Sequence, residues 1–488
     1  MNARLVASFL GVTALWMTVV ALGTGALASF LIAPIAFGLA AVAVALRRGI
    51  TRTTPRWVAG TGLLTVLAGL ALAAAGSLGG GLATVVLGAG VVFTGSQLAL
   101  LFDPPPSEEN LPSTLSAGLN AAVAVDETIK LLMQIGAVVR PARPLGEGAE
   151  DLRAAAQRHV ELGWVREPHR AHLTPPALEK PSVTRTRIRG AGQLEHLRFE
   201  SEYQPNDPEI RDGYLSHRRN RMAHAYLWRH SSGPRPTLIC IHGYGMGRIS
   251  LDARVWDVDW LHRRLGLDVA AVVLPLHGPR AILRRSGAGF LDSHPLWTNA
   301  AFGQAIWELR RLAGWLGSQG TPLLGVFGMS LGGYTAALFA SIESRLSCAI
   351  TMVPVVSLTA LLQRDLSEEK RLAQEALGLT EEVLEQAWAP HAPLGHAPRV
   401  AREGRLIVAG LADRICPPDQ AQALFEHWER PPIHWFPGTH LVPIGRRAAR
   451  ARIEQHLRDT LLSEPAPSPL PLSRFRRGRA ESEPRTGA

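Results

Sequence analysis

The sequence predicts a mixed α/β domain, with a mostly parallel sheet and helices on both faces, that follows a group of apolar helices. Two observations carry this prediction. The first hundred residues of the 488-residue chain are far more apolar than the rest, which indicates two different solvents. Strand-like runs begin at residue 196, and from residue 269 onward short apolar strands alternate with helical segments, an alternation that is typical of a mostly parallel sheet.

The N-terminal region predicts a membrane unit. Four stretches without a charge until their ends are each about as long as a bilayer-spanning helix needs, roughly 20 residues. They are residues 5–22, 27–46, 57–75 and 82–102. We therefore expect residues 1–103 to form a four-helix transmembrane unit in the lipid bilayer. The alternative for the first stretch is a signal peptide, because Arg4 precedes an apolar core and Ala26-Leu27-Ala28 resembles a cleavage site.

Basic residues predict the orientation of this unit. Arginines cluster in the loop between the second and third stretches, at Arg47, Arg48, Arg52 and Arg56. Because short basic loops stay in the cytoplasm, this loop and everything after Asp103 are predicted to be cytoplasmic. Loss of the first stretch by cleavage would leave the side of the C-terminal part unchanged. The expected protein is a multi-pass membrane protein with a cytoplasmic C-terminal domain.

The region after the last apolar stretch predicts a connector. Asp103 is followed by three prolines, which cannot continue a helix. Amphipathic helical patterns follow around Val125–Val139 and Glu150–Leu162, so residues 104–190 are predicted to be a helical connector. At the other end of the chain, residues 463–488 are rich in proline, serine and arginine and are predicted to be disordered.

The net charge of +10 does not indicate a nucleic-acid partner, because no basic stripe is interleaved with aromatic residues. The three cysteines, Cys240, Cys348 and Cys416, are far apart and match no metal-ligand spacing. They predict neither a metal site nor a disulfide framework, which suits a reducing compartment.

The segment after residue 190 supplies the strands and helices of the α/β domain. The expected strands are His196–Tyr203, Met222–Trp228, Thr237–Ile241, Val269–Leu274, Leu323–Phe327, Cys348–Val353, Arg405–Ala409 and Ile433–Phe436. Helices are expected over Ala301–Leu316 and after Ser330. Ligands of such sheets bind at the carboxyl ends of the strands, so the loops that follow the strands are the place to look for chemistry.

One of these loops has the pattern of a nucleophile elbow. Gly328-Met329-Ser330-Leu331-Gly332 joins an expected strand to an expected helix, and glycines at both ends remove side chains that would collide in such a sharp turn. A serine hydroxyl is a weak nucleophile, so it needs a histidine base oriented by a carboxylate. Asp413 follows a later strand and His440 follows the next one, whereas Asp419 is an alternative acid.

Acyl transfer also needs donors for the oxyanion of the tetrahedral intermediate. The strand at Thr237–Ile241 ends in His242-Gly243-Tyr244, where glycine lets the backbone turn toward the serine. The backbone N–H groups of Tyr244 and Leu331 are the predicted pair. We expect His242 to have a structural role in this turn.

These motifs together resemble the α/β-hydrolase superfamily over residues 195 to 460. The extra strands before His242 are similar to the dienelactone-hydrolase and prolyl-oligopeptidase-like branch. The resemblance implies a catalytic domain over residues 191–462 with a helical cap over residues 357–404, and it requires no metal or organic cofactor. Within the cap, apolar helical faces are expected at Leu358–Leu362, Leu372–Leu379 and Val383–Trp388.

The resulting expectation is a membrane-anchored serine hydrolase that cleaves carboxyl esters, including lipid or other amphipathic esters. Peptidase or thioesterase action by the same residues stays open, as does a noncatalytic protein that uses the fold as a binding module. His277 lies on another loop at the same sheet edge and is expected to be structural, with substrate contact as its alternative. Arg280, Arg284 and Arg285 are candidates for an anionic headgroup, or for a solvated surface. The oligomeric state is left open.

Overall fold

The computed structural model describes residues 3–23, 26–106, 116–138, 145–188, 192–291 and 295–463. Nearly all of the tail predicted to be disordered, residues 463–488, lies outside the described residues, and so do residues 107–115 and 139–144 of the expected connector.

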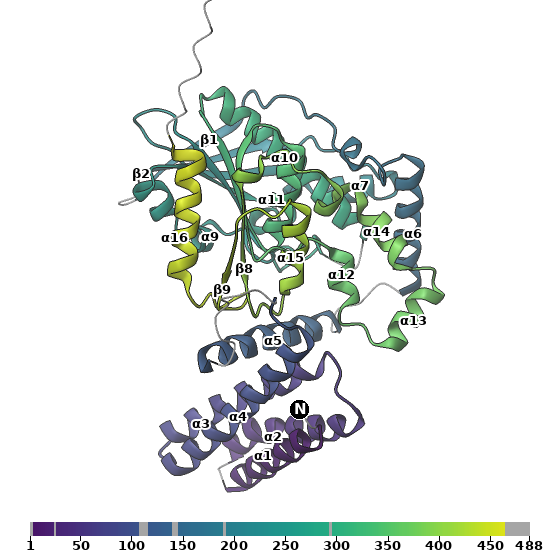
Figure 1. The fold of residues 1–488 in the computed structure, drawn as a ribbon, viewed down its shortest axis with the longest axis vertical. Helices are drawn as coiled ribbons and strands as arrows, with labels where there is room; N and C mark the ends of the chain where they lie inside the picture. Colours follow the sequence, from purple (N-terminus) through teal and green to yellow (C-terminus); the bar gives the residue numbers. More distant parts are fainter. Residues whose placement is uncertain are drawn as a thin grey trace, which may run out of the picture.

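The N-terminal region forms four helices at one end of the molecule (Figure 1). They are α1 (Ala3–Gly23), α2 (Ala26–Arg48), α3 (Thr54–Ala74) and α4 (Leu78–Phe102). Among the described residues three helices, rather than the four predicted, are long and apolar enough to cross a membrane: Arg4–Gly23, Thr54–Ala74 and Leu78–Phe102. The expected stretch 27–46 lies within α2, where the described apolar helix extends only from Ile35 to Val44.

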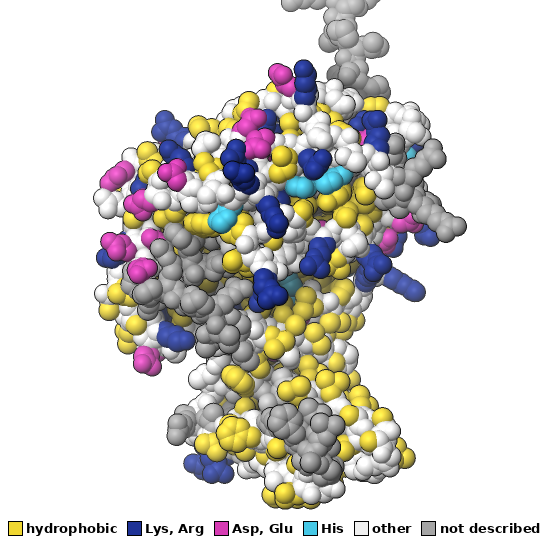
Figure 2. All heavy atoms as spheres, turned by 180° about the vertical axis from the view of Figure 1, so that it is seen from behind, with side chains coloured by type: hydrophobic (Ala, Val, Ile, Leu, Met, Phe, Trp, Pro, Cys, Tyr) yellow, Lys and Arg dark blue, Asp and Glu magenta, His cyan; other side chains and the backbone are white. Residues whose placement is uncertain are grey.

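The surface and packing of these helices fit a membrane region. Glycines let α3 and α4 touch, since a Cβ on Gly88 would lie 2.7 Å from the backbone nitrogen of Val66. Large apolar side chains such as Leu15, Leu67 and Val86 point outward and are exposed. Figure 2 shows this end of the molecule as a narrow, mainly apolar stem, with most of the visible charged side chains on the broad domain above it. Exposed apolar side chains on helices of this length fit a membrane-anchored region.

Two connector helices join the stem to the domain. Helix α5 (Ala117–Val138) lies between the apolar helices and the domain and packs against α3 and α4 (Figure 1). Helix α6 (Leu145–Glu161) packs against α14 (Glu381–Trp388), which belongs to the region predicted as the cap. The connector is therefore docked against the domain at two places.

The domain is built on a nine-stranded sheet with the order β1-β2-β3-β5-β4-β6-β7-β8-β9. Strands β1, β2, β3 and β5 pair antiparallel, and all pairs from β5 through β4 to β9 are parallel. The strands are β1 (Ser182–Ile188), β2 (Gly192–Glu200), β3 (Met222–Trp228), β4 (Thr237–Ile241), β5 (Asp268–Val273), β6 (Leu324–Met329), β7 (Leu346–Met352), β8 (Arg405–Gly410) and β9 (Ile433–Phe436). The sheet thus begins at β1, within the expected connector. Strands β4 and β8 are buried along their whole length, which is why they read as continuous apolar runs.

Helices cover both faces of the sheet, as the α/β prediction requires. One face packs against α10 (Pro295–Ser318), α11 (Leu331–Ile342) and α15 (Pro418–His427), and the other packs against α9 (Ile249–Val255) and α16 (Arg446–Leu457). The shorter helices are α7 (Pro208–Ser216), α8 (Arg218–Arg221), α12 (Leu358–Gln363) and α13 (Glu368–Ala376). In the expected cap, Ser357, Ser367 and Thr380 begin α12, α13 and α14 by accepting a backbone N–H three residues ahead. The strand order and the two helical layers confirm the predicted fold class.

Candidate active site

Ser330 occupies a strained turn between β6 and α11. Its backbone angles are φ 56° and ψ −118°, which a residue with a side chain rarely adopts. A Cβ on Gly328 would collide with the carbonyl oxygen of Gly332, and a Cβ on Gly332 would collide with that of Ile241. Only glycine fits at these two positions, so the turn has the geometry of a nucleophile elbow.

Asp413 and His440 meet at the carboxyl ends of β8 and β9. The imidazole Nδ1 of His440 lies 2.8 Å from Oδ2 of Asp413, a carboxylate that is 1% exposed. The other carboxylate oxygen accepts the backbone N–H groups of Ile415 at 2.9 Å and Cys416 at 2.7 Å. These bonds fix the carboxylate so that it holds the imidazole in one tautomer. The alternative acid, Asp419, pairs instead with Arg364.

The electrostatics of the pair favour a protonated imidazole. Burial lowers the pKa of His440, but the charge of Asp413 and the contact with Cys416 outweigh burial and raise this pKa well above the usual 6.5. His440 therefore holds its proton more strongly than a histidine in water does. A base of this kind is neutral, and able to accept a proton, only above its raised pKa.

Cys416 lies between the serine and the histidine. The Sγ atom of Cys416 lies 3.9 Å from Oγ of Ser330. Among the described residues, this is the hydrogen-bond contact of the Ser330 hydroxyl. Burial raises the pKa of the thiol, whereas the charge of His440 and hydrogen bonds with His440 and Ser330 lower it. The hydrogen bonds of the described residues do not include a direct one from Ser330 to His440, and such bonds are commonly long in ligand-free structures and tighten only when substrate is bound. The sequence analysis assigned no role to Cys416.

The predicted oxyanion donors flank the elbow. A Cβ on Gly243 would lie 3.4 Å from Cβ of Ser330, so the loop after β4 passes next to the serine. Tyr244 follows in this loop, and Leu331 is the first residue of α11, where backbone N–H groups have no acceptor within the helix. Both N–H groups thus belong to segments that adjoin Ser330.

Two histidines of this sheet edge, His242 and His277, are buried and lie within hydrogen-bond distance of the backbone. Nε2 of His242 accepts the backbone N–H of Leu274 at 3.1 Å, Nδ1 lies 2.8 Å from the carbonyl oxygen of Gly243, and burial lowers the pKa of His242 to about 4. His277 is fully buried, with Nδ1 2.8 Å from the carbonyl oxygen of Pro275. The suggestion that Arg280 meets an anionic headgroup is wrong, because its guanidinium is fully buried and makes two 2.7 Å bonds to Glu308.

Asp126 is a site residue that the sequence did not reveal. It lies on α5, far from the other site residues in sequence, and is fully buried. Its carboxylate accepts the backbone N–H groups of His440 at 2.9 Å and Leu441 at 3.2 Å, and the hydroxyl of Thr439 at 3.0 Å. It also accepts the N–H of Arg414 at 3.2 Å, so one carboxylate joins the histidine loop to the acid loop. The sequence signal that could have identified Asp126 is an acidic residue among the apolar positions of a predicted helix.

The charges around Asp126 lie close together. Burial raises the pKa of Asp126, and so does the negative charge of Asp413, whereas the charge of His440 and the backbone donors lower it. Asp413 thus contacts the ring of His440, whereas Asp126, from a separate element, contacts its backbone N–H. Two buried carboxylates this close together are stable only while the N–H and hydroxyl groups that donate to them stay in place.

Arg414 ties the acid loop to the end of α4. Its guanidinium is fully buried and donates to the carbonyl oxygens of Ala99 at 2.9 Å and Asp103 at 3.0 Å. The carboxylate of Asp103 in turn pairs with Arg52 and Arg364, both at 2.6 Å. The apolar stem is therefore hydrogen-bonded to the loop that contains Asp413 and helps to position it.

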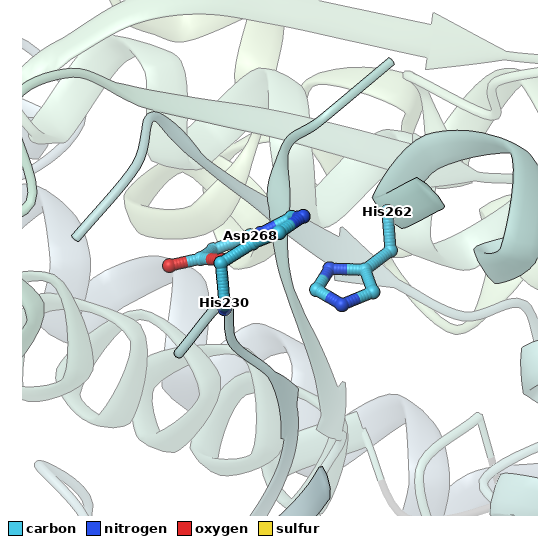
Figure 3. Close-up of side chains that lie close together, drawn as sticks. All are labelled: His230, His262 and Asp268. Carbon is cyan, nitrogen blue, oxygen red and sulfur yellow. The ribbon is translucent and has the colours of Figure 1, made fainter. Parts of the chain in front are cut away.

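One group of side chains in the described part of the chain could hold a metal ion. His230, His262 and Asp268 each offer a ligand atom, and these atoms lie within 4.8 Å of one another (Figure 3). The 2.8 Å separation between Nδ1 of His230 and Oδ1 of Asp268 is that of a hydrogen bond. Asp268 begins β5, at the sheet edge opposite to the one where Ser330 lies, so this group takes no part in the chemistry at Ser330.

The chain has close relatives in Mycobacterium tuberculosis. It is 35% identical over 338 residues to the uncharacterized proteins Rv2627c and MT2702 from two strains of this organism, and each alignment covers 68% of the chain and 80% of the relative. The chain belongs to the family of these proteins. No protein-family model matches it. The names of these two relatives state no activity, so they do not indicate a substrate.

Solved structures with similar folds are distant. The chain is 18% identical to acetyl xylan esterase 1 from Thermoanaerobacterium sp. JW/SL YS485, with a TM-score of 0.43 over 65% of this chain and 99% of that one. It is also 18% identical to a puromycin-hydrolyzing peptidase of Mycobacterium tuberculosis, with a TM-score of 0.38 over 59% of this chain and 40% of that one. The α/β-hydrolase fold of this family member is instead evident from its strand order and from the elbow at Ser330.

Proposed function

We propose that this protein is a membrane-anchored serine hydrolase that cleaves carboxyl esters through an acyl-enzyme intermediate. The observation that carries the proposal is the hydrogen bond of 2.8 Å between His440 and Asp413, next to a serine with φ 56° at a strand-to-helix turn. A histidine oriented by a buried carboxylate is what a serine needs to become a nucleophile.

In the proposed reaction, Oγ of Ser330 attacks the ester carbonyl while Nε2 of His440 takes the hydroxyl proton. The oxyanion accepts hydrogen bonds from the backbone N–H groups of Tyr244 and Leu331. His440 then gives its proton to the departing alcohol, which leaves an acyl group on Ser330. Water, deprotonated by His440, attacks this acyl group; the bond to Oγ of Ser330 breaks, the acid leaves, and His440 returns the proton to Oγ. Asp413 stays ionised and stabilises the imidazolium in both half-reactions.

We further propose that the domain lies on the cytoplasmic side of the membrane. The basic loop before α3 and the start of the connector after α4 lie at the same end of these two antiparallel helices, because Arg52 contacts Asp103 at 2.6 Å. Arg56 at the start of α3 likewise lies 3.5 Å from Glu127 on α5. A loop rich in arginine is retained in the cytoplasm, and it would hold the attached domain there.

The proposal is tested on the full chain in lipid nanodiscs with a fluorophosphonate probe and p-nitrophenyl acetate. We expect the probe to form one covalent adduct, which peptide mass spectrometry would map to Ser330, and we expect the ester to be turned over. A folded protein that neither reacts with the probe nor cleaves the ester would contradict the proposal and favour a noncatalytic binding role. Turnover of amide or thioester probes in preference to esters would identify a peptidase or a thioesterase.

The pH dependence of this reaction follows from the pKa of His440. Because Asp413 raises that pKa well above 6.5, the imidazole becomes neutral, and able to accept the serine proton, only at higher pH than a histidine in water. We expect kcat/KM to rise with pH and to reach half its maximum above pH 6.5. Asp413→Asn should lower both the midpoint and the plateau. A midpoint at or below the value for histidine in water would contradict the assignment of this pair.

A further inference from the structure

A cavity of about 440 Å³ adjoins the candidate active site. It lies between helix α16, the segment after α9 and the ends of β6 and β7, on the sheet face opposite to α10 and α11. Its volume falls in the range of about 300–1,000 Å³ that is usual for ligand pockets. Twelve of its lining residues are apolar: Met246, Val255, Trp256, Trp260, Phe327, Met329, Met352, Val353, Leu441, Pro443, Ala449 and Ile453.

One end of this cavity is formed by residues next to the chemistry. His440 and the adjacent Leu441 line it, and so does Met329, which immediately precedes Ser330. Met246 comes from the loop that carries Tyr244, the proposed oxyanion donor. A ligand that fills the cavity and reaches His440 would therefore bring its polar end to Ser330.

The charged residues of the lining are largely engaged with one another. Arg450 contacts Asp257 at 2.7 Å, and its guanidinium lies 4.4 Å from the ring centroid of Trp260. Arg446 lies 4.0 Å from the same Asp257, which leaves Arg254 as the other charged side chain of the lining besides His440. With most charges paired and twelve apolar side chains around the space, the cavity fits a hydrocarbon chain better than a sugar or a charged peptide.

The cavity also lies where a chain from a bilayer can reach it. The loops that carry Asp413 and His440 are bonded to α5 and to the end of α4, so the reactive edge of the sheet faces the apolar stem (Figure 1). Leu441, which lines the cavity, is also exposed at this edge. An amphipathic ester held at the membrane surface would meet the site at high local concentration.

We propose that this cavity binds the apolar chain of the ester substrate, so that the protein acts on esters with a long hydrocarbon chain. The proposal rests on the proposed function, since it assigns a substrate class to the same site. The chain can belong to either the acyl or the alcohol part of the ester, because both parts meet at the carbon that Ser330 attacks.

The test uses the full chain in nanodiscs and two series of esters, p-nitrophenyl esters of increasing acyl length and acetate esters of increasing alcohol length. In the series whose chain enters the cavity, we expect kcat/KM to rise about fourfold per added methylene until the cavity is full. The series that responds identifies which part of the ester carries the chain. A flat or falling profile in both series would overturn the proposal.

A matched pair of variants on α16 locates the effect. Ala449 is buried and lines the cavity, whereas Ala451 on the same helix is exposed. Ala449→Phe should reduce the ratio of long-chain to acetate turnover by about tenfold or more, as expected when a bulky side chain displaces two or more buried methylenes. Ala451→Phe should leave this ratio unchanged. If Ala449→Phe impairs folding, Ala449→Leu provides a smaller obstruction and a correspondingly smaller shift.

The outcomes separate the two proposals. Turnover of p-nitrophenyl acetate that persists in Ala449→Phe shows that Ser330 and His440 still function, so an unchanged chain-length preference in that variant would overturn the cavity assignment alone. Absence of turnover and of fluorophosphonate labelling in the unmodified protein would instead overturn the proposed hydrolase function, and the cavity assignment with it.

Discussion

Ser330→Ala is expected to lower kcat for ester hydrolysis by a factor on the order of 10⁴ to 10⁶ and to abolish fluorophosphonate labelling. The hydroxyl is the group to which the acyl chain becomes bonded in the proposed mechanism, so the acyl-enzyme cannot form on this residue without it. His440→Ala should cost about as much, and the double variant little more, because the two groups act as a unit. Steady-state turnover and labelling on the same samples measure the effect.

The control for this variant is Ser341→Ala in the same helix. The Ser341 hydroxyl donates to the carbonyl oxygen of Ala337 at 3.1 Å and lies at the far end of α11. We expect it to retain turnover and labelling at the level of the unmodified protein. If Ser330→Ala kept turnover within tenfold of that level, the nucleophile would have to be sought elsewhere, with Cys416 as the first candidate because of its contact with Ser330.

Asp126→Asn is expected to reduce kcat/KM by about 10- to 100-fold. An asparagine offers one carbonyl oxygen, and its amide group would face backbone donors such as those of His440 and Leu441. Loss of a buried hydrogen-bond acceptor costs about 1–3 kcal/mol, which here would displace the histidine loop from its position over Ser330. Because Asp126 contacts the loop and is not assigned a contact with substrate, it is a positioning residue, and most of the loss should fall on kcat.

The neighbouring acid provides the matched control. Glu127→Gln removes the same charge from the same helix, but among the described residues Glu127 lies 3.5 Å from Arg56 and forms no hydrogen bond with the histidine loop. Fluorophosphonate labelling rates as a function of pH distinguish the two variants: Asp126→Asn should shift the midpoint set by His440, and Glu127→Gln should not. Equal losses in both variants without any shift in midpoint would indicate a general effect on stability and contradict the positioning role.

Much of the fold could be predicted from the sequence because its signals are local. The strands from β3 to β9 are short apolar runs between turn residues, and each lies where the pattern predicted it. The turn at Ser330 was predictable for a similar reason, since the glycines at positions 328 and 332 are required by collisions within a few residues. Asp413 and His440 follow directly after strands, so the parallel order of β8 and β9 brings them together.

The features that could not be predicted depend on contacts between distant segments. Nothing in the helical pattern around Asp126 shows that it meets a loop more than three hundred positions further along the chain. Cys416 matches no sequence motif, and its contacts with Ser330 and His440 depend on how separate loops pack. Arg280 appeared suited to the surface because its partner, Glu308, comes from a different helix. The expected fourth membrane stretch was inferred from composition alone, whereas three helices among the described residues meet the length and hydropathy required.

The docking of α5 has a practical consequence for anyone who expresses this protein. A recombinant fragment that starts at residue 191 has every residue of the proposed triad but lacks Asp126 and the carbonyl oxygens that hold Arg414. The backbone N–H groups of His440 and Leu441 would then lack their acceptor, the carboxylate of Asp126 on α5. Inactivity of such a fragment would thus be explained by the loss of α4 and α5. Screening for substrates should therefore begin with the intact chain in lipid.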